Sequence, residues 1–430
     1  MRESAFRTRT MWQAFDARRV GILAQYERNA YGGVIFDGRD LYYTPSRQEG
    51  IAFAGPNVIF HGRVLRFDTR GDFYDEASWA AYDAKTTDGM DTRGYAGGVF
   101  DGRYVYFAPW CSQGFDHHAR VLRYDTRAQG FDVPSSWSAY DAGRTDGEGN
   151  CHGYNGAVFD GRHVYFIPLF NNELVNHGRV LRYDTEGDDF KNPARWEAYD
   201  AKDTDGIQNV GYCGAVFDGR HVYFVPSASS TSPMDAKSHA HVLRYDTKGA
   251  GFRNAGSWRA FDAGRTDGME TRGYSGGVFD GRHVYFVPNY LIGESWHARV
   301  LRYDTRKGFQ EAASWEAFDA AGTDNLPTVG FAGGAFDGRY VYFTPRNQKG
   351  RHLRYDTQSS FRESASWEAF DAGHVDNLVT EGFINAAFDG KYVYFVPHID
   401  SANTYHCRAL RFKAREDALL PPSIFGGSFY

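Results

Sequence analysis

The chain has 430 residues, of which 17% are aromatic and 49 are glycines, and its formal net charge is −6. Aromatic residues favour strands and glycines favour tight turns, so this composition argues against a helical protein. The charges are interspersed without the basic stripe typical of nucleic-acid binding, and no apolar run is long enough to cross a bilayer. We therefore expect a monomer that binds neither nucleic acid nor a membrane.

The N-terminus and the cysteines bear on location. Residues 1–12 carry three arginines but lack the apolar segment of a secretion signal, which predicts a cytoplasmic location. The four cysteines show no CxxC spacing, so we expect free thiols in a reducing compartment.

In chain order, the first predicted element is a strand at 12–17, with the pattern Trp-x-Ala-Phe-Asp-Ala. A repeated unit follows, and each copy is marked by the tripeptide Phe-Asp-Gly. The tripeptide begins at Phe36, Phe100, Phe159, Phe217, Phe279, Phe336 and Phe388.

Each unit is predicted to form four strands, called A to D in chain order. In the second unit they are 97–101, 104–108, 120–124 and 137–141. An Asp-Gly pair suits the two-residue turn between strands A and B because glycine tolerates positive φ. Pro109 ends strand B because proline donates no ladder hydrogen bond. Repeated four-stranded units of this kind are typical of a β-propeller.

The Trp-x-Ala-Phe/Tyr-Asp-Ala segment predicts how the ring closes. Its first copy precedes every strand A, while the last unit stops after its strand C at 408–412. We therefore predict an all-β, seven-bladed propeller over residues 1–412, in which 12–17 supplies the outer strand of the seventh antiparallel blade and removes a sheet edge. The segment begins at Trp12, Trp79, Trp137, Trp196, Trp258, Trp315 and Trp367.

A Val-x-Arg-Tyr-Asp segment followed by a tryptophan resembles kelch-type propeller repeats. The resemblance implies the fold only, since a propeller fold does not determine function. It is loose, because kelch units carry a Gly-Gly pair where this chain has a proline. These prolines are Pro45, Pro109, Pro168, Pro226, Pro288, Pro345 and Pro397.

The top face, defined as the end that carries the B–C and D–A connections, is the predicted functional face. Its B–C loops vary strongly between units, whereas the A–B turns at the bottom are uniform. The C-terminal tail at 413–430 breaks the repeat and ends in apolar and aromatic residues. We expect it to cover the bottom of the channel, with a partner-binding peptide as the alternative.

Two sets of repeated polar residues are expected near the top face. Three interpretations stay open for them: a histidine bonded to a loop carbonyl or to an aspartate, a repeated site for a polar ligand such as a sugar, or a metal centre. The histidines are His61, His118, His177, His239, His297 and His406. The aspartates are Asp88, Asp146, Asp205, Asp267, Asp324 and Asp376.

Residues that differ between units are the candidates for a unique ligand site at the mouth of the channel. Two arginines beside a histidine would suit an anionic ligand. The alternative is that a water-filled channel mouth simply tolerates polar residues. The candidates are Arg93, Trp110, His152, Asn155, Cys213, Arg272 and Glu381.

No GxSxG, HExxH or phosphate-loop motif occurs in the chain. We therefore expect a recognition propeller that binds a polar small molecule, a glycan or a protein on its top face, without a required cofactor. One alternative is a lyase, hydrolase or metal-dependent enzyme with a single polar site at the top of the channel. The other is a structural scaffold.

Overall fold

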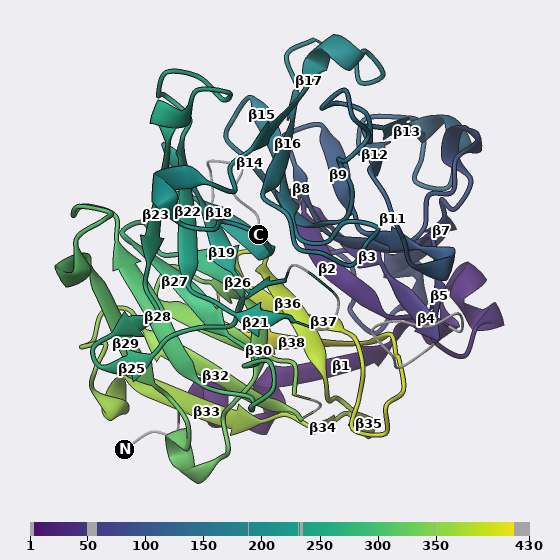
Figure 1. The fold of residues 1–430 in the computed structure, drawn as a ribbon. Helices are drawn as coiled ribbons and strands as arrows, with labels where there is room; N and C mark the ends of the chain where they lie inside the picture. Colours follow the sequence, from purple (N-terminus) through teal and green to yellow (C-terminus); the bar gives the residue numbers. More distant parts are fainter. Residues whose placement is uncertain are drawn as a thin grey trace.

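Seven four-stranded antiparallel sheets surround a central axis in the computed structural model of the chain (Figure 1). The structure describes residues 4–49, 58–187, 189–230, 232, 235–347 and 349–416. Within these ranges the chain forms strands and short 3-10 turns but no α-helix. The predicted all-β, seven-bladed propeller is confirmed.

In blades one to six the four strands follow chain order across the sheet, with strand A nearest the axis. Blades one and two contain β2 (Tyr31–Phe36), β3 (Asp40–Pro45), β6 (Arg63–Asp68) and β7 (Trp79–Asp83), then β8 (Tyr95–Phe100), β9 (Tyr104–Pro109), β12 (Arg120–Asp125) and β13 (Trp137–Asp141). Blades three and four contain β14 (Tyr154–Phe159), β15 (His163–Pro168), β16 (Arg179–Asp184) and β17 (Trp196–Asp200), then β18 (Tyr212–Phe217), β19 (His221–Pro226), β22 (His241–Asp246) and β23 (Trp258–Asp262). Blades five and six contain β26 (Tyr274–Phe279), β27 (His283–Pro288), β28 (Arg299–Asp304) and β29 (Trp315–Asp319), then β30 (Phe331–Phe336), β31 (Tyr340–Pro345), β32 (Arg351–Asp356) and β33 (Trp367–Asp371).

The seventh blade is assembled from both ends of the chain. It contains β36 (Phe383–Phe388), β37 (Tyr392–Pro397), β38 (Arg408–Lys413) and, as its outer strand, β1 (Trp12–Asp16). In Figure 1 the purple β1 runs beside the yellow β38. Trp12 pairs with Phe412 and Asp16 with Arg408, so the predicted closure is confirmed.

Outer-strand aromatic residues join each blade to the next. The Trp79 ring stacks on Phe15 of β1 with ring centroids 5.0 Å apart, and Trp12 stacks on Phe370 of blade six at 5.4 Å. The indole N–H of Trp12 donates to the carbonyl of Phe6 at 2.9 Å, and the other six outer-strand tryptophans make the same bond. Strand β1 thus contributes to both seams of the seventh blade, with blade one through Phe15 and with blade six through Trp12.

The turn after strand A is held by one repeated set of side-chain bonds. In blade two the Asp101 carboxylate accepts from the backbone N–H of Tyr104 at 2.6 Å and from the Tyr106 hydroxyl at 2.8 Å. Arg103 donates two hydrogen bonds to Asp125 at the next bottom turn. These repeated residues therefore fix the frame, which leaves the top loops as the variable part.

Small elements complete the loops. The short strands pair as β4 (Arg47–Glu49) with β5 (Ile59–Phe60), β10 (Cys111–Ser112) with β11 (Asp116–His117), β20 (Ala228–Ser229) with β21 (Lys237–Ser238), β24 (Arg265–Thr266) with β25 (Met269–Glu270), and β34 (His374–Val375) with β35 (Leu378–Val379). The 3-10 turns that precede outer strands are Arg9–Met11, Glu76–Ser78, Pro134–Ser136, Pro193–Arg195, Ala255–Ser257, Ala312–Ser314 and Ser364–Ser366. The others are Ala5–Arg7, Ala17–Arg19, Gly21–Gln25, Thr87–Gly89, Gln113–Phe115, Thr204–Gly206 and Thr323–Asn325.

The predicted tail begins with the last residue of β38, Lys413, which pairs with Tyr392. Its remainder from 417 onward lies outside the described residues, so its proposed position beneath the channel stays a prediction.

Candidate functional site

A cavity of about 720 Å³ lies on the propeller axis at the top face, and all seven blades contribute to its wall. The upper ring of the wall is formed by the residue that follows the proline ending each strand B. These seven residues differ in size and polarity although the strands before them are nearly identical. They are Ser46, Trp110, Leu169, Ser227, Asn289, Arg346 and His398.

A second ring lies below the first, at the second residue of each strand A. It is mostly small, which keeps the cavity open near the axis. Its members are Gly32, Ala96, Asn155, Cys213, Ser275, Ala332 and Ile384.

The third residue of each strand A narrows the channel. Six of the seven are glycines that approach one another closely: a Cβ added to Gly276 would lie 2.6 Å from the Cα of Gly333. Asn385, with φ of 71°, is the exception, and it is the one residue of this ring that carries a side chain. The ring consists of Gly33, Gly97, Gly156, Gly214, Gly276, Gly333 and Asn385.

Three of the seven residues predicted for the ligand site line this cavity: Trp110, Asn155 and Cys213. Cys213 is partly exposed, whereas Cys111, Cys151 and Cys407 are buried, and all four are free thiols as expected. Burial raises the pKa of Cys213, while Ser227 and the charge of Arg346 partly oppose that rise.

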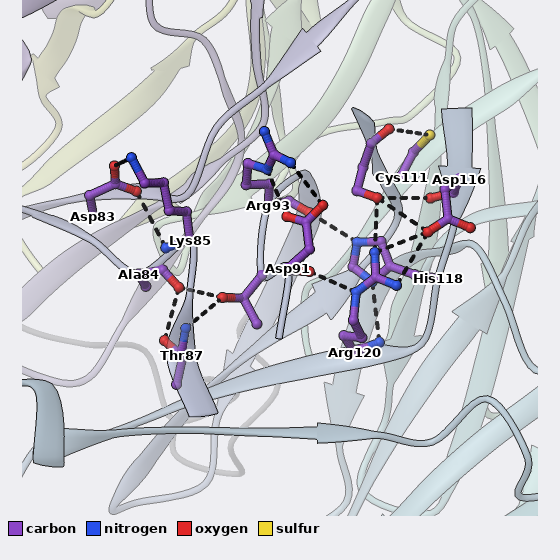
Figure 2. Close-up of polar contacts among 12 residues, drawn as sticks. Asp83, Ala84, Lys85, Thr87, Asp91, Arg93, Cys111, Asp116, His118 and Arg120 are labelled. Atoms are coloured by element: carbon purple, nitrogen blue, oxygen red, sulfur yellow. Dashed lines mark hydrogen bonds and ion pairs between the residues drawn. The ribbon is translucent and has the colours of Figure 1, made fainter. Parts of the chain in front are cut away.

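The other four predicted residues do not line the cavity. Each stands immediately before a glycine that has positive φ, such as Gly94 at 69°, and this glycine turns the chain before strand A begins. Figure 2 shows the consequence for Arg93, whose guanidinium pairs with Asp91 at 2.6 Å and 2.9 Å while its carbonyl accepts from His118. The structure therefore places this residue in a polar network of its own blade.

The remaining three have local partners too. His152 donates from Nε2 to the carbonyl of Gly149 at 2.6 Å, and Arg272 pairs with Glu270. Glu381 accepts from the Ser401 hydroxyl. The structure does not bring these residues together with Trp110, Asn155 and Cys213.

The six repeated histidines are bonded to backbone groups through both ring nitrogens. In each, Nδ1 accepts the backbone N–H two residues later, so Nε2 carries the proton and donates to a carbonyl near the start of strand A. For His118 these distances are 3.2 Å to Arg120 N and 2.9 Å to Arg93 O (Figure 2). The Nε2 acceptors of the six are Ala30, Arg93, His152, Val210, Gly273 and Glu381.

This geometry matches the first interpretation of the histidines, a bond to a loop carbonyl, and it fixes a neutral ring. Burial lowers the pKa of His118, His239 and His406 to about 3, and that of His177 and His297 to about 4. A metal could be bound there only if one of these backbone bonds were broken. In the described ranges, no cluster of three or more His, Cys, Asp or Glu has the geometry of a metal site.

The repeated aspartates are not partners of those histidines. The carboxylate of Asp205 accepts at 2.9 Å from the backbone N–H of Ala260, in the outer strand of the next blade. Asp88, Asp267, Asp324 and Asp376 make the same contact with Ala139, Ala317, Ala369 and Ala14. Asp146 instead caps the 148–150 turn and pairs with Arg179 at 3.1 Å. Five aspartates thus tie a top loop to a neighbouring sheet edge.

Two arginines and a histidine on consecutive blades line the cavity, and none was among the predicted candidates. Arg346 belongs to blade six, His398 to blade seven and Arg47 to blade one. Arg47 is 6% exposed, lies over the Trp110 ring at 4.8 Å and donates to the Tyr405 hydroxyl at 3.3 Å. Comparing the residues after the strand-B prolines would have revealed Arg346 and His398, because six different residue types occupy this position in the seven blades.

The B–C loop of blade five supplies an aromatic wall at the mouth of the cavity. Tyr290, Ile292 and Trp296 line the cavity and remain 38%, 40% and 37% exposed. The rings of Tyr290 and Trp296 meet edge to face with centroids 5.1 Å apart. Large apolar side chains exposed together at a cavity are typical of a ligand-binding surface.

Comparisons with known proteins bear on the fold alone. No family model and no curated protein matches the chain. The extracellular domain of the putative hybrid two component system BT4673 from B. thetaiotaomicron is similar, with a TM-score of 0.50 and 11% identity over 93% of this chain and 39% of that chain. The structure of YjhT gives a TM-score of 0.44 and 10% identity over 74% of this chain and 94% of that chain.

The chain thus spans only 39% of the first of these structures. At this identity the first likeness supports a propeller fold and nothing finer, so the kelch resemblance of the repeats stays an expectation. No helix in the ranges that the structure describes is long and apolar enough to cross a membrane.

Proposed function

We propose that this propeller is a recognition protein that binds one polar small molecule in the axial cavity at its top face. The observation that carries the proposal is the contrast between uniform blades and the six different residue types at the seven positions that follow the strand-B prolines. Repeated packing alone would favour the same residue in each blade. All seven of these residues line one cavity of about 720 Å³, within the range of about 300–1,000 Å³ usual for small-molecule sites.

The wall chemistry supports a ligand with both polar and apolar parts. Asn155 and Ser275 face the cavity as partly exposed polar residues, and the aromatic wall stands at its mouth. A single axial site favours one ligand per chain over the repeated sites between blades that the histidine and aspartate sets suggested. None of the described residues that line the cavity is Asp or Glu, so they do not supply the carboxylate pair often used for acid–base catalysis. Binding is therefore favoured over the enzyme alternative.

A cavity-filling variant tests this proposal. We expect a ligand identified from a broad metabolite and saccharide panel by thermal shift to bind with a stoichiometry of one in calorimetry. Ser227→Trp places a large side chain in the upper ring and should abolish that binding. Ser360→Trp, at an exposed position on the opposite end, is the matched control and should leave the affinity unchanged. Several sites per chain, or a ligand unaffected by Ser227→Trp, would contradict an axial site.

A further inference from the structure

The cavity wall is positively charged on one side. Arg346, His398 and Arg47 come from consecutive blades, so they form a continuous sector of the upper wall. No carboxylate is found among the described residues that line the cavity. A guanidinium stays protonated at every physiological pH, so two full charges face this space.

Arg346 departs from the way the chain treats its other arginines. The repeated arginines of the bottom turns pair with aspartates, as in Arg103 with Asp125 at 2.7 Å. Those of strand C pair with a glutamate, as in Arg302 with Glu316 at 2.6 Å, or contact another side chain, as Arg244 does over the Phe309 ring at 4.5 Å. The Arg346 side chain makes no hydrogen bond or ion pair with any residue that the structure describes, although burial lowers its pKa. Arg346 is partly exposed to the cavity, and an anionic ligand would give it the counter-ion that no described residue supplies.

The neighbours of Arg346 offer one acceptor, suited to a hydroxyl group of the ligand, and one donor, suited to its anionic oxygens. His398 donates from Nδ1 to the Tyr31 carbonyl at 3.2 Å, which leaves Nε2 as an acceptor without a protein partner among the described residues. Burial and the two arginines lower the pKa of His398, so its ring is neutral. Asn385 uses Oδ1 to accept its neighbour's backbone N–H at 2.8 Å, which leaves its amide N–H groups available.

The departure of Asn385 from the glycine ring lies on the same side. Every other blade has glycine at this position, and only blade seven, between the two arginines, places a side-chain amide there. Two cations, an amide donor and a neutral acceptor therefore converge on one sector. This sector faces a cavity whose opposite blades contribute Leu169 and Phe170.

We infer that the ligand of the axial cavity is a small organic anion whose carboxylate or phosphate group binds against the sector formed by Arg346, Arg47 and Asn385, while a hydroxyl group of the ligand donates to His398. This inference rests on the proposed function, because it assumes that small molecules enter the cavity. The apolar part of the ligand packs on the remaining wall. The charge of the ligand, and not its hydroxyl groups alone, sets its affinity.

Cys213 lies in the cavity and is the one cysteine that is not buried, so it reports on this charge directly. We compare its alkylation by iodoacetate, an anion, with that by iodoacetamide, its neutral analogue, by peptide mass spectrometry of the full-length protein at pH 8. Both reagents react with the thiolate, so a change in the pKa of Cys213 affects both rates equally. The rate with iodoacetate divided by the rate with iodoacetamide is therefore independent of that pKa. The ratio is normalised to that of free N-acetylcysteine amide in the same buffer.

We expect the normalised ratio to exceed one by about tenfold, the low end of the enrichment that a charged cleft gives. Arg346→Gln should lower it several-fold, while Arg127→Gln, exposed on a bottom turn, should leave it unchanged. In the wild-type protein, acetate or inorganic phosphate should slow iodoacetamide labelling. Greater protection by acetate identifies a carboxylate ligand, and greater protection by phosphate identifies a phosphorylated one.

Two failures are distinguishable. If iodoacetamide labels Cys213 and the wild-type ratio equals that of the free thiol, the anionic ligand is refuted while the axial site survives. If neither reagent labels Cys213 in the folded protein, even when the pH is raised to offset the raised pKa of this thiol, but both label it after denaturation, the cavity is closed and the proposed function fails with the inference. The wild-type ratio decides the matter even if Arg346→Gln does not fold.

Discussion

Mild acid should destabilise this propeller through its repeated histidines. Five of them are at most 5% exposed: His61, His118, His239, His297 and His406. In the unfolded chain a histidine gains a proton below about pH 6.5. In the folded chain burial holds the pKa of His118, His239 and His406 to about 3 and that of His297 to about 4. Stability is therefore fully present above pH 6.5 and is lost as the pH falls toward those folded values.

The size of the effect follows from this difference in proton binding. Lowering the pH from 7.5 to 5.5 reduces the free energy of unfolding by about 1.4 kcal/mol for each histidine that is protonated only in the unfolded chain. For the five buried histidines this gives about 7 kcal/mol, a large part of the stability of about 5–15 kcal/mol typical of a folded protein. Protonation of Nδ1 would also place two N–H donors against each other, since Nδ1 of His118 accepts from Arg120 N.

Urea denaturation at closely spaced pH values measures this effect. We expect the free energy of unfolding to fall steadily from pH 6.5 to 5, with an uptake of several protons on unfolding. The lowered aspartate pKa values, such as that of Asp184 at about 2, act only below pH 4 and do not contribute in this window. A free energy of unfolding that is flat between pH 7.5 and 5.5 would refute the assignment of neutral, doubly bonded histidines.

Three further pairs of substitutions test the frame by chemical denaturation. Trp12→Ala should lower the free energy of unfolding by about 3–5 kcal/mol, because Trp12 is 2% exposed in the closing seam. Trp296→Ala, at 37% exposure, should lower it by less than about 1 kcal/mol. Equal losses would argue against closure by β1. Gly276→Ala and Gly268→Ala share the strain of φ near +80°, but only the first would press its Cβ against the neighbouring blade, so it should lose about 1–3 kcal/mol more. Asp205→Gly should lose about 1–3 kcal/mol and Asp205→Asn, which keeps an acceptor, clearly less; an equal loss would contradict the bond between blades.

The fold could be predicted because its determinants recur along the chain. The Asp-Gly turn, the proline after strand B and the outer-strand tryptophan each occupy one position per blade, so seven imperfect copies define one pattern. The copy at Trp12 stands before the first complete unit, and the last unit lacks its outer strand. A closed ring lets the first segment complete the last unit, so the closing strand could be predicted. None of these arguments needs knowledge of a contact between distant residues.

The site could be predicted only in part. Asn155 and Cys213 were placed near the axis because they follow the first aromatic residue of strand A. Arg93 and Arg272 stand two residues before that aromatic residue, and a glycine with positive φ lies between each arginine and strand A. The sequence does not reveal that this glycine directs the arginine away from the cavity. The aromatic wall was missed because B–C loops differ in length, so Trp296 has no equivalent position to compare in other blades.

The most direct test of an axial anion site is a crystal structure of the protein soaked with a mixture of small carboxylates and phosphate esters. The account predicts difference density for one molecule on the propeller axis, with its anionic oxygens within hydrogen-bond distance of the Arg346 guanidinium and its body toward Trp296. Density at the outer top loops near Arg93 or Arg272, with only water on the axis, would contradict it.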